Sequence, residues 1–92
     1  SLSKLTALTV LGLDNTSLYD LTMITPLIKL GLLSLRDNDI KDITALANFA
    51  HVYSIDLHGN NNISCVDLRS LTEELGYSNG TPVLTSPESC IQ

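Results

Sequence analysis

The chain has 92 residues, enough for one domain, and its ten acidic and five basic side chains give a net charge of −5. The acidic balance argues against nucleic acid as a partner, because phosphate backbones bind through Lys and Arg. No apolar run approaches the roughly 18 residues that a membrane span needs. Hydrophobic residues make up 43% of the chain and aromatic residues only 4%, a composition typical of an aliphatic core.

Apolar residues recur along the chain at one fixed spacing, the distance in sequence from Leu5 to Leu27. The columns are Leu5, Leu27, Phe49 and Leu71; Leu8, Leu30 and Val52; Leu11, Leu33 and Ile55; Leu13, Leu35 and Leu57; and Leu2, Ile24, Leu46 and Leu68. This repetition predicts a solenoid in which each turn packs on the turn before it. We expect three repeats within residues 1–70, the first preceded by a partial repeat, and the remainder of a C-terminal cap in residues 71–92.

One short stretch of each repeat alternates in polarity and predicts a strand, at 10–14, 32–36 and 54–58. Alternation directs one apolar pair of each strand into the core, namely Leu11 and Leu13, Leu33 and Leu35, and Ile55 and Leu57. Because the repeats share one register, we expect neighbouring strands to form a parallel sheet, about 4.8 Å apart. The predicted fold class is an α/β solenoid with short helical or 3₁₀ turns opposite the sheet.

Two polar columns follow the predicted strands. The members of the first are Thr16, Asn38 and Asn60. An inward Asn there can hydrogen-bond the backbone of the turn, whereas Thr16 offers only a hydroxyl, so we expect the first turn to be the loosest. The members of the second, all good N-cap residues, are Asp20, Asp42 and Ser64. We expect each of them to start a helical or 3₁₀ turn.

After the third repeat the pattern changes. A longer amphipathic helix is predicted to begin near residue 67, with Asp67 as its N-cap and Gly76 just past its end. Residues 78–82 are a turn cluster, residues 83–85 predict one last short strand, and residues 87–92 are a tail that only Cys90 ties down. We interpret this segment as a C-terminal cap over the last repeat.

The repeat resembles that of the leucine-rich repeat family, in the 22-residue class found in bacterial internalins and phosphatase regulatory subunits. Residues 27–46 match L-x-x-L-x-x-L-x-L-x-x-N-x-I-x-D-I-x-x-L at every defined position, and the resemblance extends from Leu2 to about Leu75. The segment Asn62-Ile63-Ser64-Cys65, with the helix, strand and Cys90 that follow, also resembles a cap of bacterial leucine-rich repeat proteins. The resemblance implies a right-handed arc that recognises proteins through its concave sheet, without a cofactor.

The resemblance to a capped array leads us to expect a disulfide between Cys65 and Cys90, the two cysteines of the chain. Closing a loop of this length contributes about 3 kcal/mol to stability. The bond would also indicate an oxidising compartment. Two alternatives stay open: two unpaired cysteines, or a zinc site that adds His51 and His58, although the spacing fits no usual zinc motif.

The outward strand positions are the candidate binding residues of the concave face. They form three rows, Val10, Leu32 and Ser54; Gly12, Ser34 and Asp56; and Asp14, Arg36 and His58, with Tyr53 at the rim. One side of the face is small and apolar and the other is charged, with Arg36 between Asp14 and His58. The alternative is a solvated row that only stabilises the sheet, each exposed pair contributing about 0.2–1 kcal/mol. Asp56 and His58 share one face, but we expect no catalysis, because an open sheet excludes no water.

These features predict a non-enzymatic module that binds a protein partner through the concave sheet, in an extracellular, cell-surface or periplasmic setting of bacterial type. A second hypothesis is a structural end-cap or stalk of a larger repeat protein. A third is an intracellular regulatory subunit with both cysteines free. The sequence starts inside a repeat, at Leu2, so we expect either a longer array or a homodimer through the uncapped N-terminal end. We expect no metal and no cofactor.

Overall fold

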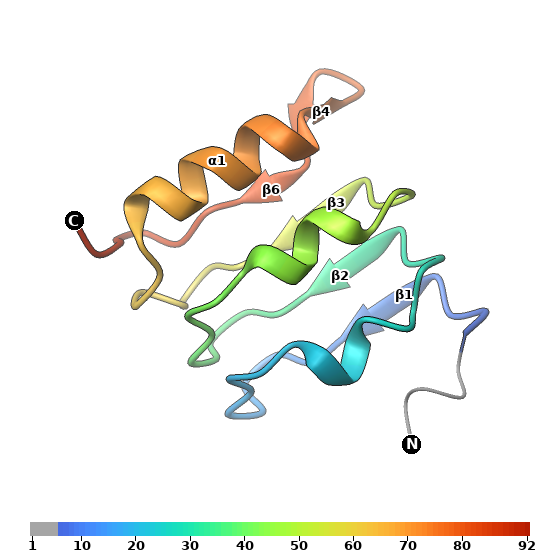
Figure 1. Ribbon diagram of the computed structural model, residues 1–92, viewed down its shortest axis with the longest axis horizontal. Helices are drawn as coiled ribbons and strands as arrows, with labels where there is room; N and C mark the ends of the chain where they lie inside the picture. Colours follow the sequence, from blue (N-terminus) through green and yellow to red (C-terminus); the bar gives the residue numbers. More distant parts are fainter. Residues whose placement is uncertain (1–5) are drawn as a thin grey trace.

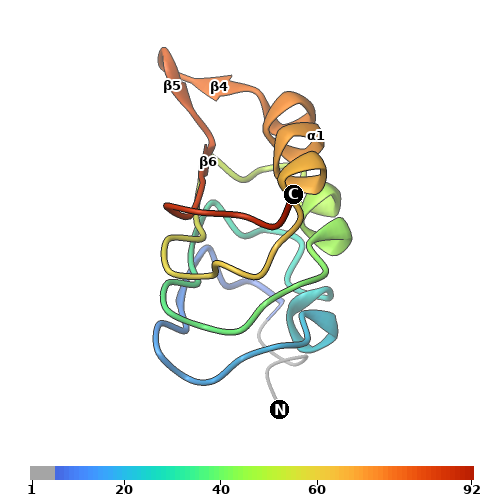
Figure 2. The same cartoon turned by 90° about the vertical axis from the view of Figure 1, so that its left-hand side faces the viewer.

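The computed structural model describes residues 6–92 and has two layers, a parallel sheet and a row of helical segments (Figure 1). The main sheet contains, in spatial order, β1 (Val10–Gly12), β2 (Leu32–Ser34), β3 (Ser54–Asp56) and β6 (Leu84–Thr85). The helical segments are the 3₁₀ turns η2 (Thr22–Ile24) and η3 (Thr44–Asn48) and the helix α1 (Cys65–Leu75). A hairpin of β4 (Tyr77–Ser78) and β5 (Thr81–Pro82) precedes β6. Figure 2 shows the sheet on one side of the molecule and the helical segments on the other.

The first three strands pair in parallel, and each residue lies opposite its equivalent in the next repeat. The partners are Val10, Leu32 and Ser54 in one row and Leu11, Leu33 and Ile55 in the next. Backbone pairing continues past the strand ends, since the Leu13 amide donates to the Ser34 carbonyl (2.9 Å) and the Leu35 amide donates to the Asp56 carbonyl (2.9 Å). The strands predicted over 10–14, 32–36 and 54–58 are therefore shorter as regular strands, while the paired backbone extends beyond them.

The last strand of the main sheet comes from the C-terminal segment. β6 pairs with β3, with Ile55 opposite Leu84 and Asp56 opposite Thr85, so the offset in sequence is longer than the one between the first three strands. The longer offset accommodates α1, which has 11 residues where η2 has 3 and η3 has 5, together with the hairpin. The strand predicted over 83–85 is confirmed as β6.

The core lies between the two layers and consists of the inward apolar columns. Its fully buried members include Ile24, Leu27, Leu30, Leu33, Leu35, Ile40, Leu46, Ile55, Leu57 and Ile63. In the first repeat Leu21 is buried, but four other leucines that pack against this core are only partly buried: Leu8, Leu11, Leu13 and Leu18. Leu2 and Leu5, which we assigned to the same columns, lie outside the described residues. Within residues 6–92, burial is therefore deepest in the second and third repeats.

The start of α1 differs in part from the prediction. Ser64 is its N-cap, and the Ser64 hydroxyl accepts a hydrogen bond from the Asp67 amide (3.4 Å). Asp67 is not the N-cap, because the helix already begins at Cys65. Asp67 lies in the first helical turn, where a carboxylate interacts favourably with the helix dipole. Gly76 ends the helix with a φ of 67°, as the pattern predicted for a residue just past the helix.

The N-cap assignments of Asp20 and Asp42 were wrong by one position. The N-cap positions of η2 and η3 are the following residues, Leu21 and Ile43. Each aspartate instead accepts a hydrogen bond from the amide two residues on, at 2.9 Å in the first repeat and 3.1 Å in the second. Such a bond closes a small turn of its own, so each 3₁₀ segment starts one residue later than expected.

The turn cluster predicted over 78–82 is the tip of the hairpin. Asn79 and Gly80 have φ angles of 54° and 81°. A two-residue hairpin loop with both central residues left-handed follows the right-handed twist of its strands, and Asn-Gly is its preferred sequence. The hairpin itself was not predicted, because β4 and β5 have two residues each and are too short to show an alternating pattern.

Candidate functional site

Asn60 fixes the backbone that follows β3. Its side chain is fully buried, and its amide group donates to the carbonyls of Leu57 (3.0 Å) and Leu35 (2.8 Å). Its Oδ1 accepts a hydrogen bond from the Ile40 amide (3.2 Å). One side chain therefore connects two successive turns and satisfies buried backbone groups, as we predicted for an inward Asn.

Asn38 makes the same kind of connection one repeat earlier. Its amide group donates to the carbonyls of Leu13 (2.9 Å) and Leu35 (3.1 Å). Its Oδ1 accepts hydrogen bonds from the amides of Thr16 (2.9 Å) and Leu18 (3.0 Å). The first turn is thus held mainly from the next repeat, while the Thr16 hydroxyl donates to the Leu13 carbonyl (2.8 Å). That this turn is the loosest stays a prediction.

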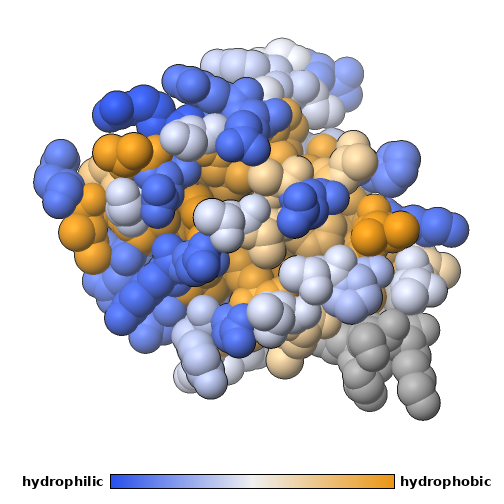
Figure 3. All heavy atoms as spheres, in the orientation of Figure 1, coloured by the Kyte–Doolittle hydropathy of each residue, from blue (hydrophilic) through white to orange (hydrophobic). Residues whose placement is uncertain are grey.

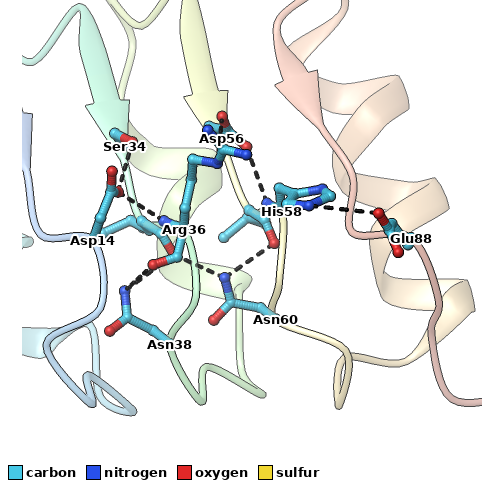
Figure 4. Close-up of polar contacts among 10 residues, drawn as sticks. Asp14, Ser34, Arg36, Asn38, Asp56, His58, Asn60 and Glu88 are labelled. Atoms are coloured by element: carbon cyan, nitrogen blue, oxygen red, sulfur yellow. Dashed lines mark hydrogen bonds and ion pairs between the residues drawn. The ribbon is translucent and has the colours of Figure 1, made fainter.

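Polar side chains at the ends of the strands form a connected row on the outward face of the main sheet, the side away from the helical segments (Figure 4). Asp14 Oδ1 accepts hydrogen bonds from the Ser34 hydroxyl (2.7 Å) and from the Arg36 amide (2.9 Å). The Arg36 guanidinium lies 3.5 Å from the Asp56 carboxylate, and both groups are partly exposed. Arg36 therefore forms its ion pair within the sheet with Asp56, and contacts Asp14 through its backbone.

The row continues to the C-terminal tail. Asp56 Oδ1 accepts a hydrogen bond from the His58 amide (3.0 Å), and His58 Nε2 lies 3.6 Å from Glu88 Oε1. The link between Asp56 and His58 runs through the backbone, and the imidazole faces Glu88. Exposed pairs of this kind contribute about 0–1 kcal/mol each, so the row positions its side chains more than it stabilises the fold.

The Asp14 carboxylate is held in its charged form. The Ser34 hydroxyl and, after it, the Arg36 amide lower the pKa of Asp14, because both donors stabilise the carboxylate. The side chain is nevertheless exposed to solvent. Asp14 is therefore a fixed negative charge just after β1.

The opposite end of the outward face is apolar. Val10 is 55% exposed and Tyr53 is 50% exposed, while Leu32 on the middle strand is half-buried. A Cβ added at Gly31 would lie 2.7 Å from Tyr53 Cε2, so the aromatic ring lies over this glycine. The Tyr53 amide also donates to the Gly31 carbonyl (2.8 Å). Tyr53 is therefore packed on the neighbouring repeat and does not project freely from the rim.

The structure thus brings the predicted residues onto one face, apolar at one end and charged at the other. The remaining predicted members, Ser54 and Gly12, lie on the same strands, and Ser54 is half-buried. Sequence reasoning missed Gly31 and Glu88. Gly31 stands one repeat length before Tyr53, and a glycine beside an aromatic residue in adjacent repeats was an available signal. Glu88 lies outside the repeat, so no spacing could have placed it opposite His58.

Cys65 and Cys90 form a disulfide, with their Cα atoms 5.0 Å apart, which confirms the expected pairing. The bond joins the first residue of α1 to the C-terminal tail. Backbone hydrogen bonds hold the same tail, from the Cys65 amide to the Ile91 carbonyl (2.9 Å) and from the Ile91 amide to the Ile63 carbonyl (2.8 Å). Our expectation of a tail held only by Cys90 was therefore wrong, as was the alternative of two free thiols.

The zinc alternative with His51 and His58 is wrong, because both cysteine sulfurs are bonded to each other. Over residues 6–92, His, Cys, Asp and Glu side chains form no group of three that could hold a metal ion. In the same part of the chain, no helix has the length and apolar character needed to cross a membrane.

Comparison of the chain with protein-family models gives no match, and comparison with curated proteins gives none either. The interpretation of the outward face therefore depends on the repeat in the chain and on the contacts described above.

Proposed function

We propose that this protein is a non-enzymatic recognition module that binds a protein partner through the outward, concave face of its main sheet. One observation carries the proposal: three neighbouring strands present a continuous face whose side chains are already held by one another. Tyr53 lies over Gly31, and Asp14 is fixed by Ser34 and the Arg36 amide. Side chains ordered before binding lose less conformational freedom when a partner arrives, which favours recognition.

We further propose that the chain belongs to the leucine-rich repeat family, in its 22-residue class, and forms the C-terminal end of a right-handed solenoid. The pairing of β1, β2 and β3 at an offset of one repeat supports this assignment. So do Asn38 and Asn60, each of which joins its own turn to the turn before it. The apolar columns supply the stacked interior that such repeats share.

We propose an extracellular, cell-surface or periplasmic location of bacterial type. The disulfide is compatible with that location, because such bonds persist in oxidising compartments. The intracellular hypothesis required both cysteines to be free, and they are paired.

A structural end-cap is the second candidate function. It is favoured by the way α1, the hairpin and the disulfide finish the C-terminal end of the sheet. In that case the outward face would stabilise the sheet and contact no partner, and substitutions there would change stability alone.

Two matched triple variants separate these candidates. The first, Val10→Ser with Arg36→Ser and Tyr53→Ser, removes side chains from the outward face. The second, Tyr19→Ser with Met23→Ser and Ile28→Ser, removes three exposed side chains outside the sheet. Binders selected from a displayed library of natural secreted and cell-surface protein fragments should lose about tenfold or more in affinity for the first variant and little for the second. Binders that respond to the second variant alone, or a selection without binders, would contradict the recognition proposal.

A homodimer through the N-terminal end is a further proposal. It is supported by the partial exposure of leucines that pack at the β1 side of the core, such as Leu11 and Leu13. Light scattering should then give a dimer mass that falls on dilution. A monomer mass at every concentration would contradict it.

A further inference from the structure

The Asp14 carboxylate just after β1 has one oxygen engaged and one available. Both of its hydrogen bonds, from the Ser34 hydroxyl and the Arg36 amide, reach the same atom, Oδ1. Within residues 6–92, Oδ2 has no hydrogen-bond or ion-pair partner. A carboxylate that is fixed on one oxygen and exposed on the other can accept a hydrogen bond from a partner without reorienting.

The sign of the surrounding charge favours a cation at this position. Asp14, Asp56 and Glu88 are the acidic members of the polar row, and the positive charge of Arg36 is already engaged by Asp56 at 3.5 Å. The row is therefore predominantly acidic, like the whole chain with its net charge of −5. An approaching cation is attracted by this field and an anion is repelled, with a strength that decreases as salt is added.

The surface between Asp14 and the apolar end of β1 is open. Val10 in β1 and Asp14, two residues past the end of β1, lie on the outward side with Gly12 between them, and a Cβ added at Gly12 would meet no atom within 4 Å. A partner backbone can therefore approach the strand closely at the glycine. Four residues of extended chain span about 13 Å, in the strand and in a partner segment alike.

From these three observations we propose that the partner presents an extended segment with a Lys or Arg four residues from an apolar side chain. The cation contacts Asp14, and the apolar side chain packs on Val10, Leu32 and the ring of Tyr53. The inference rests on the proposed function and adds the chemistry of the partner. It also explains why Tyr53, a type of residue enriched at binding hot spots, is held at the apolar end of the face.

The test uses the disulfide-bonded protein and a phage library of random peptides of about 12 residues, long enough to contain the four-residue spacing. Enriched peptides are synthesised together with twins in which Gln replaces each Lys or Arg. Their affinities are measured by calorimetry for the wild type, Asp14→Asn, Gly12→Val and Asp67→Asn. Asn at position 14 keeps an oxygen that can accept the bonds from Ser34 and Arg36, and Asp67 is a matched exposed aspartate on α1.

The inference predicts that Asp14→Asn weakens the basic peptides about fivefold at low salt and leaves their Gln twins unchanged. Gly12→Val should weaken both peptide types because it fills the open space, and Asp67→Asn should weaken neither. Peptides that bind the outward face without a basic residue, or with acidic residues, would overturn the inference while leaving the proposed function in place. Peptides that are insensitive to the outward-face triple variant, or no enriched peptide, would overturn both.

Discussion

The two ends of the main sheet are finished in different ways. Beside β6, the helix α1 covers the last turn, the disulfide joins that helix to the tail, and Ile91 extends the backbone pairing. Beside β1, the apolar side chains at the end of the core remain partly exposed, for example Leu11 and Leu13. In the view of Figure 3, from the helical side, apolar side chains also show between polar ones across the middle of the molecule.

This difference shows how a stacked repeat gains stability. Each turn touches only its neighbours, so an inward residue of a strand is covered best where a strand lies on both sides of it. Leu33 has β1 and β3 beside it and is 1% exposed, whereas Leu11, its partner in the register, lies in the first strand of the sheet and is half-buried. Equivalent residues in different repeats therefore contribute different amounts to the free energy of unfolding.

The largest expected effect is a loss of core packing in the middle of the sheet. Leu33→Ala should lower the free energy of unfolding by about 3 kcal/mol, since it removes a fully buried side chain and leaves a cavity. Leu11→Ala should cost about 1 kcal/mol, because part of that side chain is already in water. Urea denaturation of both variants measures the difference between their free energies of unfolding. Equal losses would show that the first repeat is as well covered in solution as the second.

The second effect is largest at the C-terminal end. Replacing Cys65 and Cys90 by Ala should cost about 3 kcal/mol, because the unfolded chain loses a loop constraint. Amide hydrogen exchange should accelerate most at Ile91 and in β6, because the tail can then also open locally, whereas exchange in β1 should accelerate only by the loss of global stability. A uniform acceleration along the chain would contradict a local role for the disulfide.

Asn60 and Asn38 allow the same comparison between a well-covered turn and a more exposed one. Asn60→Ala should destabilise the protein by about 2 kcal/mol, because it leaves the buried Ile40 amide without a partner and removes one of the two donors at each of the Leu35 and Leu57 carbonyls. Asn38→Ala should cost about 1 kcal/mol, although it makes more hydrogen bonds, because water can reach several of the groups it contacts. Thermal unfolding measures which of the two variants is less stable. A larger loss of stability for Asn38→Ala would contradict the greater exposure that we assign to the first turn.

The smallest effect is a pH dependence of stability at the outward face. The pKa of Asp14 is lowered in the folded protein, so its contribution is present above the unfolded value and is lost as the pH falls through the folded pKa, below about pH 4. Asp14→Asn should therefore flatten the decline in stability under acid, and only slightly, because the group is exposed. Urea titrations of the wild type and of Asp14→Asn at several pH values measure this slope. An unchanged slope for Asp14→Asn would show that the Ser34 and Arg36 contacts do not persist in solution.

Much of the layout was accessible from the sequence, because a repeat of fixed length restates the same information three times. The columns that contain Leu11 and Asn38 place the strands and the turns directly. The cap was harder to predict, since it occurs once. Its helix begins at Cys65 because Ser64, and not Asp67, supplies the capping hydroxyl, and several equally suitable cap residues stand in this segment.

The contacts within the candidate site were the least predictable. Spacing shows that Asp14, Arg36 and His58 share one row, but it does not say which carboxylate a long guanidinium side chain will reach. Arg36 extends to Asp56, and His58 is met by Glu88 from a tail that has no repeat. These pairs depend on the direction of each side chain and on contacts between distant segments. A single sequence gives little information about either.

The central claim is that recognition uses the outward face of the sheet, and nuclear magnetic resonance tests it most directly. The measurement is a map of amide chemical-shift changes in the 92-residue protein as a selected binder is added. We predict that the largest changes fall on β1, β2 and β3 and on the residues just after them, including Asp14 and Arg36. Changes confined to η2, η3 and α1, with the strands unaffected, would contradict the account.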